Sequence, residues 1–187
     1  EPTRAARAIQ EFVDEHLSNW YVRLCRRRFW RGELNTDKLA AYQTLYRCLE
    51  VISQLMAPIA PFYAERLFRD LNETTGREAA ASVHLALFPK ADGGLIDTAL
   101  EQRMQLAQDI CSMVLSLRKK ENIRVRQPLQ KILVDGKFQA LLADLAPLIK
   151  EELNIKDLEF VADIADYMDF RLKPDFRAAG PALGAKV

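Results

Sequence analysis

The chain has 187 residues, of which 49% are hydrophobic and 28% are charged, and its formal net charge is +1. This length and composition are typical of a globular protein whose core needs no disulfide or metal, and no apolar run approaches the length of a membrane span. Because the net charge is close to zero, any binding to nucleic acid would have to depend on local clusters of basic residues.

The three cysteines, Cys25, Cys48 and Cys111, are widely spaced and form no CxxC pair. This spacing indicates reduced thiols in a cytoplasmic protein and argues against a zinc site. The abrupt start at Glu1 and the Gly-rich end at 180–187 are typical of a piece of a longer chain. No signal peptide is recognisable.

The first predicted helix runs from about Thr3 to Trp30, with Gly32 as its stop. At about 100° per residue, one apolar stripe would face a core. It consists of Ile9, Val13, Leu17, Trp20 and Leu24. A second stripe beside it is cationic and aromatic. Its members are Arg23, Arg27 and Trp30, with Arg26 on the margin.

The second stripe favours binding to unpaired RNA, because cations meet phosphates while aromatic rings stack on splayed bases. Other interpretations are that Trp20 and Tyr21 pack in the core, that Arg28 pairs with a buried acid, and that the basic face is merely solvated. A solubilising face normally mixes both signs of charge, whereas residues 20–32 contain no acid. This difference favours the RNA interpretation.

A second helix is predicted after the cap candidates Asn35, Thr36 and Asp37. Its period-3.6 apolar stripe comprises Leu39, Tyr42, Leu45, Tyr46, Leu49, Ile52 and Met56. A third helix is expected over 61–71, with its large apolar side chains, including Phe62 and Phe68, turned inward. Residues 72–96 lack a helical period and predict a long loop, and its apolar, extended segment 82–89 should be held against another element.

A fourth helix should begin at a capping box formed by Thr98 and Glu101 and end in the basic run 118–120. Cations at a helix end also complement its dipole, so this run has a purely local explanation too. Residues 123–128 are predicted to be extended, with Arg124 and Arg126 on one side. A second cationic edge would result.

Strand-like residues 132–134, a helical stretch over 138–153 and strand-like residues 158–161 predict a small α/β unit, to which an extended piece at 167–172 could be added. The expected fold is therefore mainly α, an antiparallel helical bundle followed by this α/β unit. The expected domains are 1–126, the helical part, and 127–187, a truncated C-terminal part.

No pattern of catalytic residues is recognisable in the chain. It has no Gly-rich phosphate loop, no paired metal-ligand spacing and no nucleophile elbow. Asp163, Asp166 and Asp169 recur every three residues, which is more typical of a solvated edge than of a metal site. These features favour a binding function over an isolated enzyme.

Several runs in chain order resemble the anticodon-binding region of the isoleucyl-tRNA synthetase family. They are Ser18-Asn19-Trp20-Tyr21-Val22-Arg23, Arg26-Arg27-Arg28-Phe29-Trp30, Asp37-Lys38, Ala41 to Tyr46, Met56 to Phe62 with Glu65, Ser82-Val83-His84-Leu85, Val125 to Leu129 and Glu151 to Lys156. The valyl and leucyl families share the Ala-Pro-Phe turn. The run from Asn19 to Trp30 resembles the isoleucyl family best.

The resemblance implies a tRNA-binding part of a class I ligase that charges isoleucine tRNA with ATP and Mg²⁺. The catalytic and editing sites would lie in the rest of the parent chain, so the expected partners are isoleucine tRNA and that catalytic domain, with no membrane and no cofactor in this part. Many relatives end in a zinc module, which has no counterpart here. The candidate tRNA-binding residues are Arg23, Arg26, Arg27, Trp30, Arg31, Lys119, Lys120, Arg124 and Arg126. A generic RNA-binding domain, a protein-interaction module and a valyl or leucyl domain remain as alternatives.

Overall fold

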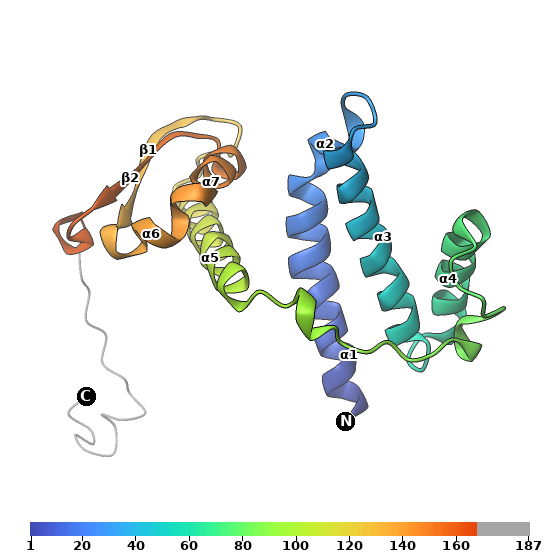
Figure 1. The fold of residues 1–187 in the computed structure, drawn as a ribbon. Coiled ribbons are helices and arrows are strands. Elements are labelled where there is room, and N and C mark those ends of the chain that lie inside the picture. The colour runs from blue at the N-terminus through green and yellow to red at the C-terminus, as the bar shows by residue number, and fades with distance from the viewer. Residues whose placement is uncertain (168–187) are drawn as a thin grey trace, which may run out of the picture. The chain divides into compact units, whose positions relative to one another are not determined.

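The computed structural model describes residues 1–167. The chain divides after Gln102 into two compact units, unit 1 (Glu1–Gln102) and unit 2 (from Arg103 onward). Helices dominate, and one small parallel sheet lies near the C-terminal end of the described chain (Figure 1). This confirms the predicted fold class, a helical part followed by a small α/β unit. The predicted domain boundary between residues 126 and 127 stays a prediction.

The first helical arm of unit 1 comprises α1 (Pro2–Glu11), a π-helical stretch η1 (Phe12–Val22) and α2 (Arg26–Trp30). The arm covers the predicted first helix, with a change of winding in η1 and a break at Cys25, where ψ is 0°. Gly32 has φ +73° and ends the arm. Glycine adopts this left-handed conformation without the steric cost that a side chain would add.

Helix α3 (Thr36–Met56) returns antiparallel to this arm (Figure 1). Asn35 caps it, because its side-chain oxygen accepts a hydrogen bond from the Lys38 amide at 2.8 Å. The two helices meet at the buried Ala41, whose carbonyl accepts a hydrogen bond from the Tyr21 hydroxyl at 3.0 Å. A small residue at the crossing allows close approach of the two backbones. Leu39 and Tyr42 of the predicted core stripe are exposed.

Helix α4 (Pro61–Thr75) lies beside α3 and ends at Gly76, with φ +58°. Its buried residues are Ala64 and Phe68, one helical turn apart. The expectation that Phe62 faces inward was wrong, since its side chain is 91% exposed. Phe62 precedes Ala64 by two residues, which places it about 200° around the helix from the buried side.

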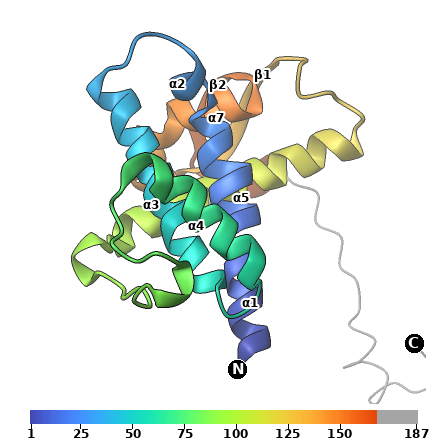
Figure 2. The same ribbon diagram turned by 90° about the vertical axis from the view of Figure 1, so that its right-hand side faces the viewer.

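After α4 the chain runs back along this helix towards the turn between α3 and α4 (Figure 2). It contains two 3₁₀ turns, η2 (Val83–Leu85) and η3 (Gly93–Leu95). Segment 82–89 is held against another element as expected, because Val83 is buried with Ala64 and Phe68. It is not wholly extended, since η2 forms a turn in which the Ser82 hydroxyl accepts a hydrogen bond from the His84 amide at 3.2 Å.

Helix α5 (Thr98–Lys120) is capped by Asp97 rather than by the predicted capping box of Thr98 and Glu101. The Asp97 carboxylate accepts a hydrogen bond from the Leu100 amide at 3.0 Å. The cap is therefore an aspartate, one residue before the predicted cap residue Thr98.

The α/β part of unit 2 contains β1 (Leu129–Asp135), η4 (Gly136–Phe138), α6 (Gln139–Leu142), η5 (Ala143–Leu145), α7 (Ala146–Leu153), β2 (Ile155–Val161) and η6 (Ile164–Tyr167). The two strands are parallel, and Leu129 pairs with Ile155. Pro147 lies in the first turn of α7, where its missing N–H costs no helical hydrogen bond. The strand–helix–strand expectation is confirmed. Tyr167 belongs to η6, and the rest of the predicted piece 167–172 lies outside the described residues.

The core of unit 2 is apolar and is drawn from α5, α6, α7 and both strands. Its buried members are Ala107, Cys111, Val134, Leu142, Ile149, Leu153, Ile155 and Val161. Leu142, Ile149 and Leu153 are completely buried. Full burial of such side chains contributes on the order of 1.5–3 kcal/mol each.

Candidate nucleic-acid interface

The end of the first arm carries five arginines between residues 23 and 31. Arg28 is bound to the carboxylate of Asp37. Its Nε donates to Asp37 Oδ2 at 2.8 Å, and its Nη2 donates to Asp37 Oδ1 at 2.7 Å. These hydrogen bonds to Asp37 raise the pKa of Arg28 above its ordinary value. The bidentate pair ties α2 to the first turn of α3 across the connecting loop.

The partner of Arg28 differs from the expected buried acid, since Asp37 is exposed. Lys38 adds a further restraint, because its Nζ donates to the carbonyls of Arg31 at 3.4 Å and Gly32 at 3.2 Å. The turn after α2 is therefore held from both sides, by Arg28 of α2 bound to Asp37 and by Lys38 of α3. This arrangement fixes where the side chains of α2 project.

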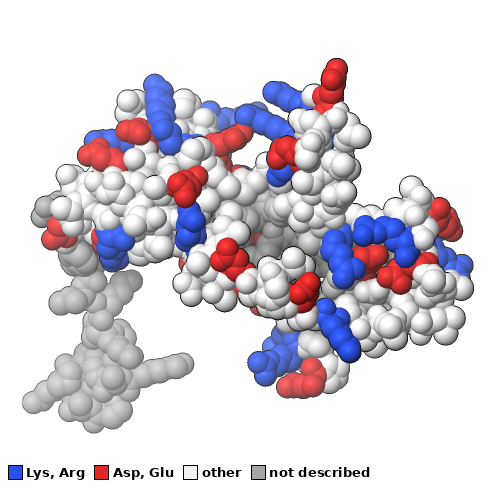
Figure 3. Space-filling model, viewed as in Figure 1, with Lys and Arg blue, Asp and Glu red and all other residues white. Residues whose placement is uncertain are grey.

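Trp30 is 80% exposed, whereas Trp20 is buried. The guanidinium carbon of Arg26 lies 5.9 Å from the centroid of the Trp30 ring, within the range of a cation–π contact. The other candidate arginines of this segment, Arg23, Arg27 and Arg31, are also exposed. The structure thus places an accessible aromatic ring among solvent-facing cations. In Figure 3 the visible charged side chains at this end of unit 1 include both basic and acidic ones.

Trp20 and Tyr21 pack inside unit 1, as the alternative interpretation of these aromatics held. Tyr21 donates its hydroxyl hydrogen bond to α3, and its ring meets that of Phe29 edge-on at 6.5 Å between centroids. Burial raises the pKa of Tyr21. Phe29 in turn lies 5.0 Å from the Tyr42 ring. A chain of three aromatic rings therefore joins η1, α2 and α3.

The second basic segment, in unit 2, is built around Arg118. This side chain is only 3% exposed and lies at the end of α5. Its Nη1 donates to the carbonyls of Arg124 at 3.1 Å and Gln127 at 2.9 Å. Its Nη2 donates to the carbonyls of Leu153 at 2.9 Å and Asn154 at 3.4 Å. One guanidinium thus joins a loop to the end of α7.

The loop over 123–128 is a turn, so the expectation of an extended segment was wrong. The Gln127 amide donates to the Arg124 carbonyl at 2.9 Å. The Asn154 side-chain amide donates to the carbonyls of Val125 at 2.9 Å and Arg126 at 3.1 Å. Four successive carbonyls are therefore satisfied from outside the loop, and this fixes a bend that alternation of side chains could not predict.

The four candidate cations of unit 2, Lys119, Lys120, Arg124 and Arg126, are exposed. The structure brings them together around the end of α5 and the following turn. Arg118 was missed as a structural residue because the sequence shows it only as one member of a basic run. Asn154, with φ 50°, could have been found, since Asn after a helix often adopts the left-handed conformation.

Within residues 1–167, no group of three or more His, Cys, Asp or Glu side chains could hold a metal ion. None of the helices in that range combines the length and apolar character that crossing a membrane requires.

Residues 1–133 match the family model described as the anticodon-binding domain of tRNA ligase. The isoleucine–tRNA ligase of Bacteroides thetaiotaomicron is 53% identical over 190 residues, an alignment that covers 100% of this chain and 16% of the relative. The corresponding ligase of Porphyromonas gingivalis is 54% identical over 187 residues, with 98% and 16% covered. That of Clostridium novyi is 44% identical over 185 residues, with 99% and 18% covered.

The chain therefore spans less than a fifth of the length of the curated relatives it matches, at 16% and 18% of these examples. The similarity extends along the whole chain and includes the α/β part that follows the family model. It confirms the resemblance inferred from the sequence motifs.

Proposed function

Since the chain belongs to the anticodon-binding domain family of tRNA ligases, we propose that it is the tRNA-recognising part of an isoleucine–tRNA ligase. Its similarity to isoleucine–tRNA ligases over its full length carries this assignment. The parent enzyme would charge isoleucine tRNA in the cytoplasm, using ATP and Mg²⁺ bound in its catalytic domain. The expected domains 1–126 and 127–187 would both belong to its tRNA-binding region.

We propose that the end of the first arm contacts the anticodon loop, and the exposed Trp30 ring beside Arg26 is the observation that carries this location. A base unstacked from the loop would stack on Trp30, while arginines bind the adjacent phosphates. Arg23 and Arg27 are the residues we expect to meet the loop directly. The remaining phosphate contacts would come from Arg26, Arg31, Lys119, Lys120, Arg124 and Arg126.

The salt dependence of tRNA binding by the parent ligase tests the proposed phosphate contacts. Arg27→Ala should weaken binding and reduce the slope of log K against log salt by about one, because one fewer counterion is released. Arg66→Ala is the matched control, since Arg66 is an exposed helical arginine on α4, paired with Asp70 at 2.9 Å. An unchanged slope in the Arg27 variant would place the contact elsewhere.

The choice of tRNA separates the isoleucine assignment from its alternatives. The parent should charge isoleucine tRNA with isoleucine, and competition by isoleucine tRNA should exceed that by valine or leucine tRNA. A base mismatch in the anticodon should weaken binding, because base contacts specify and phosphate contacts only position. Equal competition by all three tRNAs would instead favour a generic RNA-binding module.

A further inference from the structure

A second exposed surface of unit 1 is apolar and lies far along the chain from the basic arm. Residues 79–89 contain no Lys, Arg, Asp or Glu. Within them Leu85, Leu87 and Phe88 are exposed, Leu87 to 89%. The exposed Ile59 belongs to the turn between α3 and α4, next to Pro58. Pro58, Leu87 and Phe88 line one open hollow of about 270 Å³, so the turn and the loop share a surface.

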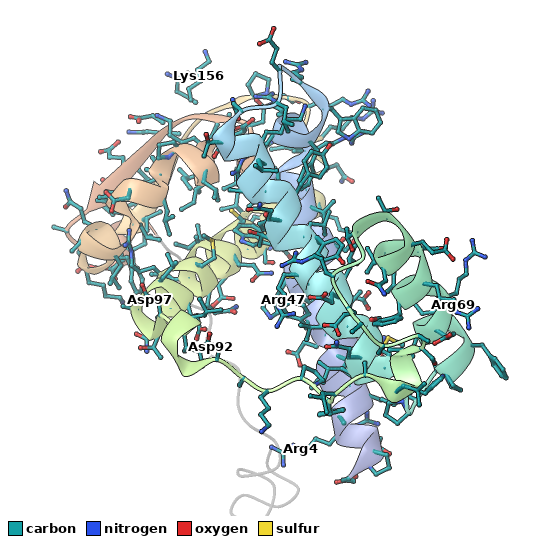
Figure 4. All side chains as sticks on the ribbon, turned by 45° about the vertical axis from the view of Figure 1, so that its right-hand side comes forward. Arg4, Arg47, Arg69, Asp92, Asp97 and Lys156 are labelled. Atoms are coloured by element: carbon teal, nitrogen blue, oxygen red, sulfur yellow. The ribbon has the colours of Figure 1, made fainter. Side chains whose placement is uncertain are left out.

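The loop that carries these side chains is fixed by Glu65 of α4. Glu65 Oε2 accepts hydrogen bonds from the Ser82 hydroxyl at 2.8 Å and from the Val83 amide at 2.9 Å. Its Oε1 accepts one from Arg69 at 2.6 Å. The hydrogen bond from the Val83 amide is the largest of the causes that lower the pKa of Glu65. Arg69 projects from the outer side of α4 in Figure 4.

The anchoring divides the loop into a buried half and an exposed half. Val83 is inserted between α4 and the preceding helix end, with Ala64 and Phe68 around it. The residues that follow η2 leave this core and project their apolar side chains outward. An ordered loop that exposes several large apolar residues is a preorganised contact surface, because little further conformational entropy is lost when a partner binds to it.

The chemistry of this surface argues against tRNA as its occupant. Phosphate binding needs cations, and the charge-free stretch 79–89 supplies none. The small apolar area of this surface also argues against a second copy of the chain as its occupant. The exposed parts of Ile59, Leu85, Leu87 and Phe88 can bury on the order of a few hundred Å², well below the ~1,200 Å² per interface typical of stable association.

We infer that Ile59, Leu85, Leu87 and Phe88, here called the apolar strip, dock on an apolar surface of the catalytic domain of the parent ligase. This inference rests on the proposed function. The relatives are several times longer than this chain, which covers 16% of their length, so most of a parent protein is available to cover the strip. A domain tethered in the same chain has an effective concentration in the millimolar range, at which a small apolar contact suffices.

Site-specific photocrosslinking in the full-length parent tests the docking. A benzophenone amino acid replaces Leu87 in one variant and Glu73, an exposed residue near the end of α4, in the control. The strip variant should crosslink within its own chain to a peptide of the catalytic domain, at least about tenfold more than the control. A crosslink to a second copy, a crosslink to tRNA, or a yield equal to that of the control would overturn the inference.

Thiol labelling provides a second measurement that does not depend on the crosslinker. In the folded parent, a maleimide should modify Leu87→Cys at least about tenfold more slowly than Glu73→Cys, and the two rates should converge in denaturant. Equal rates in the folded parent would show that the strip is uncovered. The double variant Leu87→Ser, Phe88→Ser should retain tRNA affinity within about twofold, since the strip does not contact tRNA.

Aminoacylation by the same preparation separates the two proposals. A parent that charges isoleucine tRNA but shows an uncovered strip would refute the docking alone. A parent that does not charge isoleucine tRNA would refute the proposed function, and with it the identity of the docking partner.

Discussion

The two basic segments, residues 23–31 and 118–126, look alike in sequence but are built differently. In each, an arginine helps to hold the fold, and the candidate tRNA-binding cations are exposed. In the first, Arg28 binds the exposed carboxylate of Asp37. In the second, Arg118 is buried and binds only backbone carbonyls. The number of cations in a run therefore does not give the number available to a ligand.

The difference follows from what each arginine faces. Arg118 lies where the end of α5 meets a turn and the end of α7, and helix ends and turns leave carbonyls without backbone partners. A guanidinium carries five donors and can satisfy several of them at once. Arg28 faces the start of α3, where an acid is favoured by the helix dipole. The first site thus depends on charge pairing, and the second on hydrogen bonding of the backbone.

The largest predicted effect is the loss of stability on removing Arg118. It tests whether the buried arginine of the second segment contributes more to the fold than an exposed one. Arg118→Met leaves the carbonyls of Gln127 and Leu153 without their donor, which should lower the free energy of unfolding by about 3 kcal/mol. Urea denaturation followed by circular dichroism measures the change. The matched control Arg126→Met, at an exposed position of the same segment, should change it by less than ~0.5 kcal/mol. Similar losses in both variants would contradict a special role for Arg118.

The aromatic content of the two segments should separate their contributions to tRNA binding. Residues 118–127 contain no aromatic residue, whereas Trp30 stands exposed in the first segment. Trp30→Ala should cost ~1–3 kcal/mol in tRNA affinity, roughly 5- to 150-fold, if the ring stacks on a base. Filter binding with the parent ligase measures it.

Phe62→Ala is the control for this loss, because Phe62 is an exposed aromatic on α4 outside the proposed interface. Its affinity should stay within about twofold of the unmodified protein. Neither substitution should alter the unfolding midpoint much, since both rings are mostly in solvent. An equal loss of affinity in the two variants would show that exposed aromatics in general, rather than Trp30 in particular, support binding.

Sequence patterns correctly predicted the features that depend on residues close together in the chain. The Asn35 cap, the stop at Gly32 and the strand–helix–strand order all follow from residues close together in the sequence. The exposure of Trp30 beside a buried Trp20 also follows from the helical wheel. These features need only the helical period and the chemistry of caps and turns.

Features that depend on distant partners could not be predicted in this way. The turn at 124–127 exists because Arg118 and Asn154 satisfy its carbonyls, and neither residue is marked for that role by its neighbours. The outward position of Phe62 depends on which side of α4 the loop residue Val83 covers. Such choices are made by tertiary packing, which overrides a local apolar pattern.

The smallest predicted effect concerns the Arg28–Asp37 pair, which should couple the shape of α2 to tRNA binding. Because both side chains are partly exposed, the pair should contribute only about 0.5–1 kcal/mol to stability, measured as the coupling in a double-mutant cycle of Arg28→Met and Asp37→Asn. The pair ties α2 to α3, so either variant should also weaken tRNA binding a few-fold while leaving the free energy of unit 2 unchanged. Additive losses in stability would mean that the pair contributes nothing beyond its separate side chains. The Arg28–Asp37 pair would then not stabilise the first segment in the way that Arg118 stabilises the second.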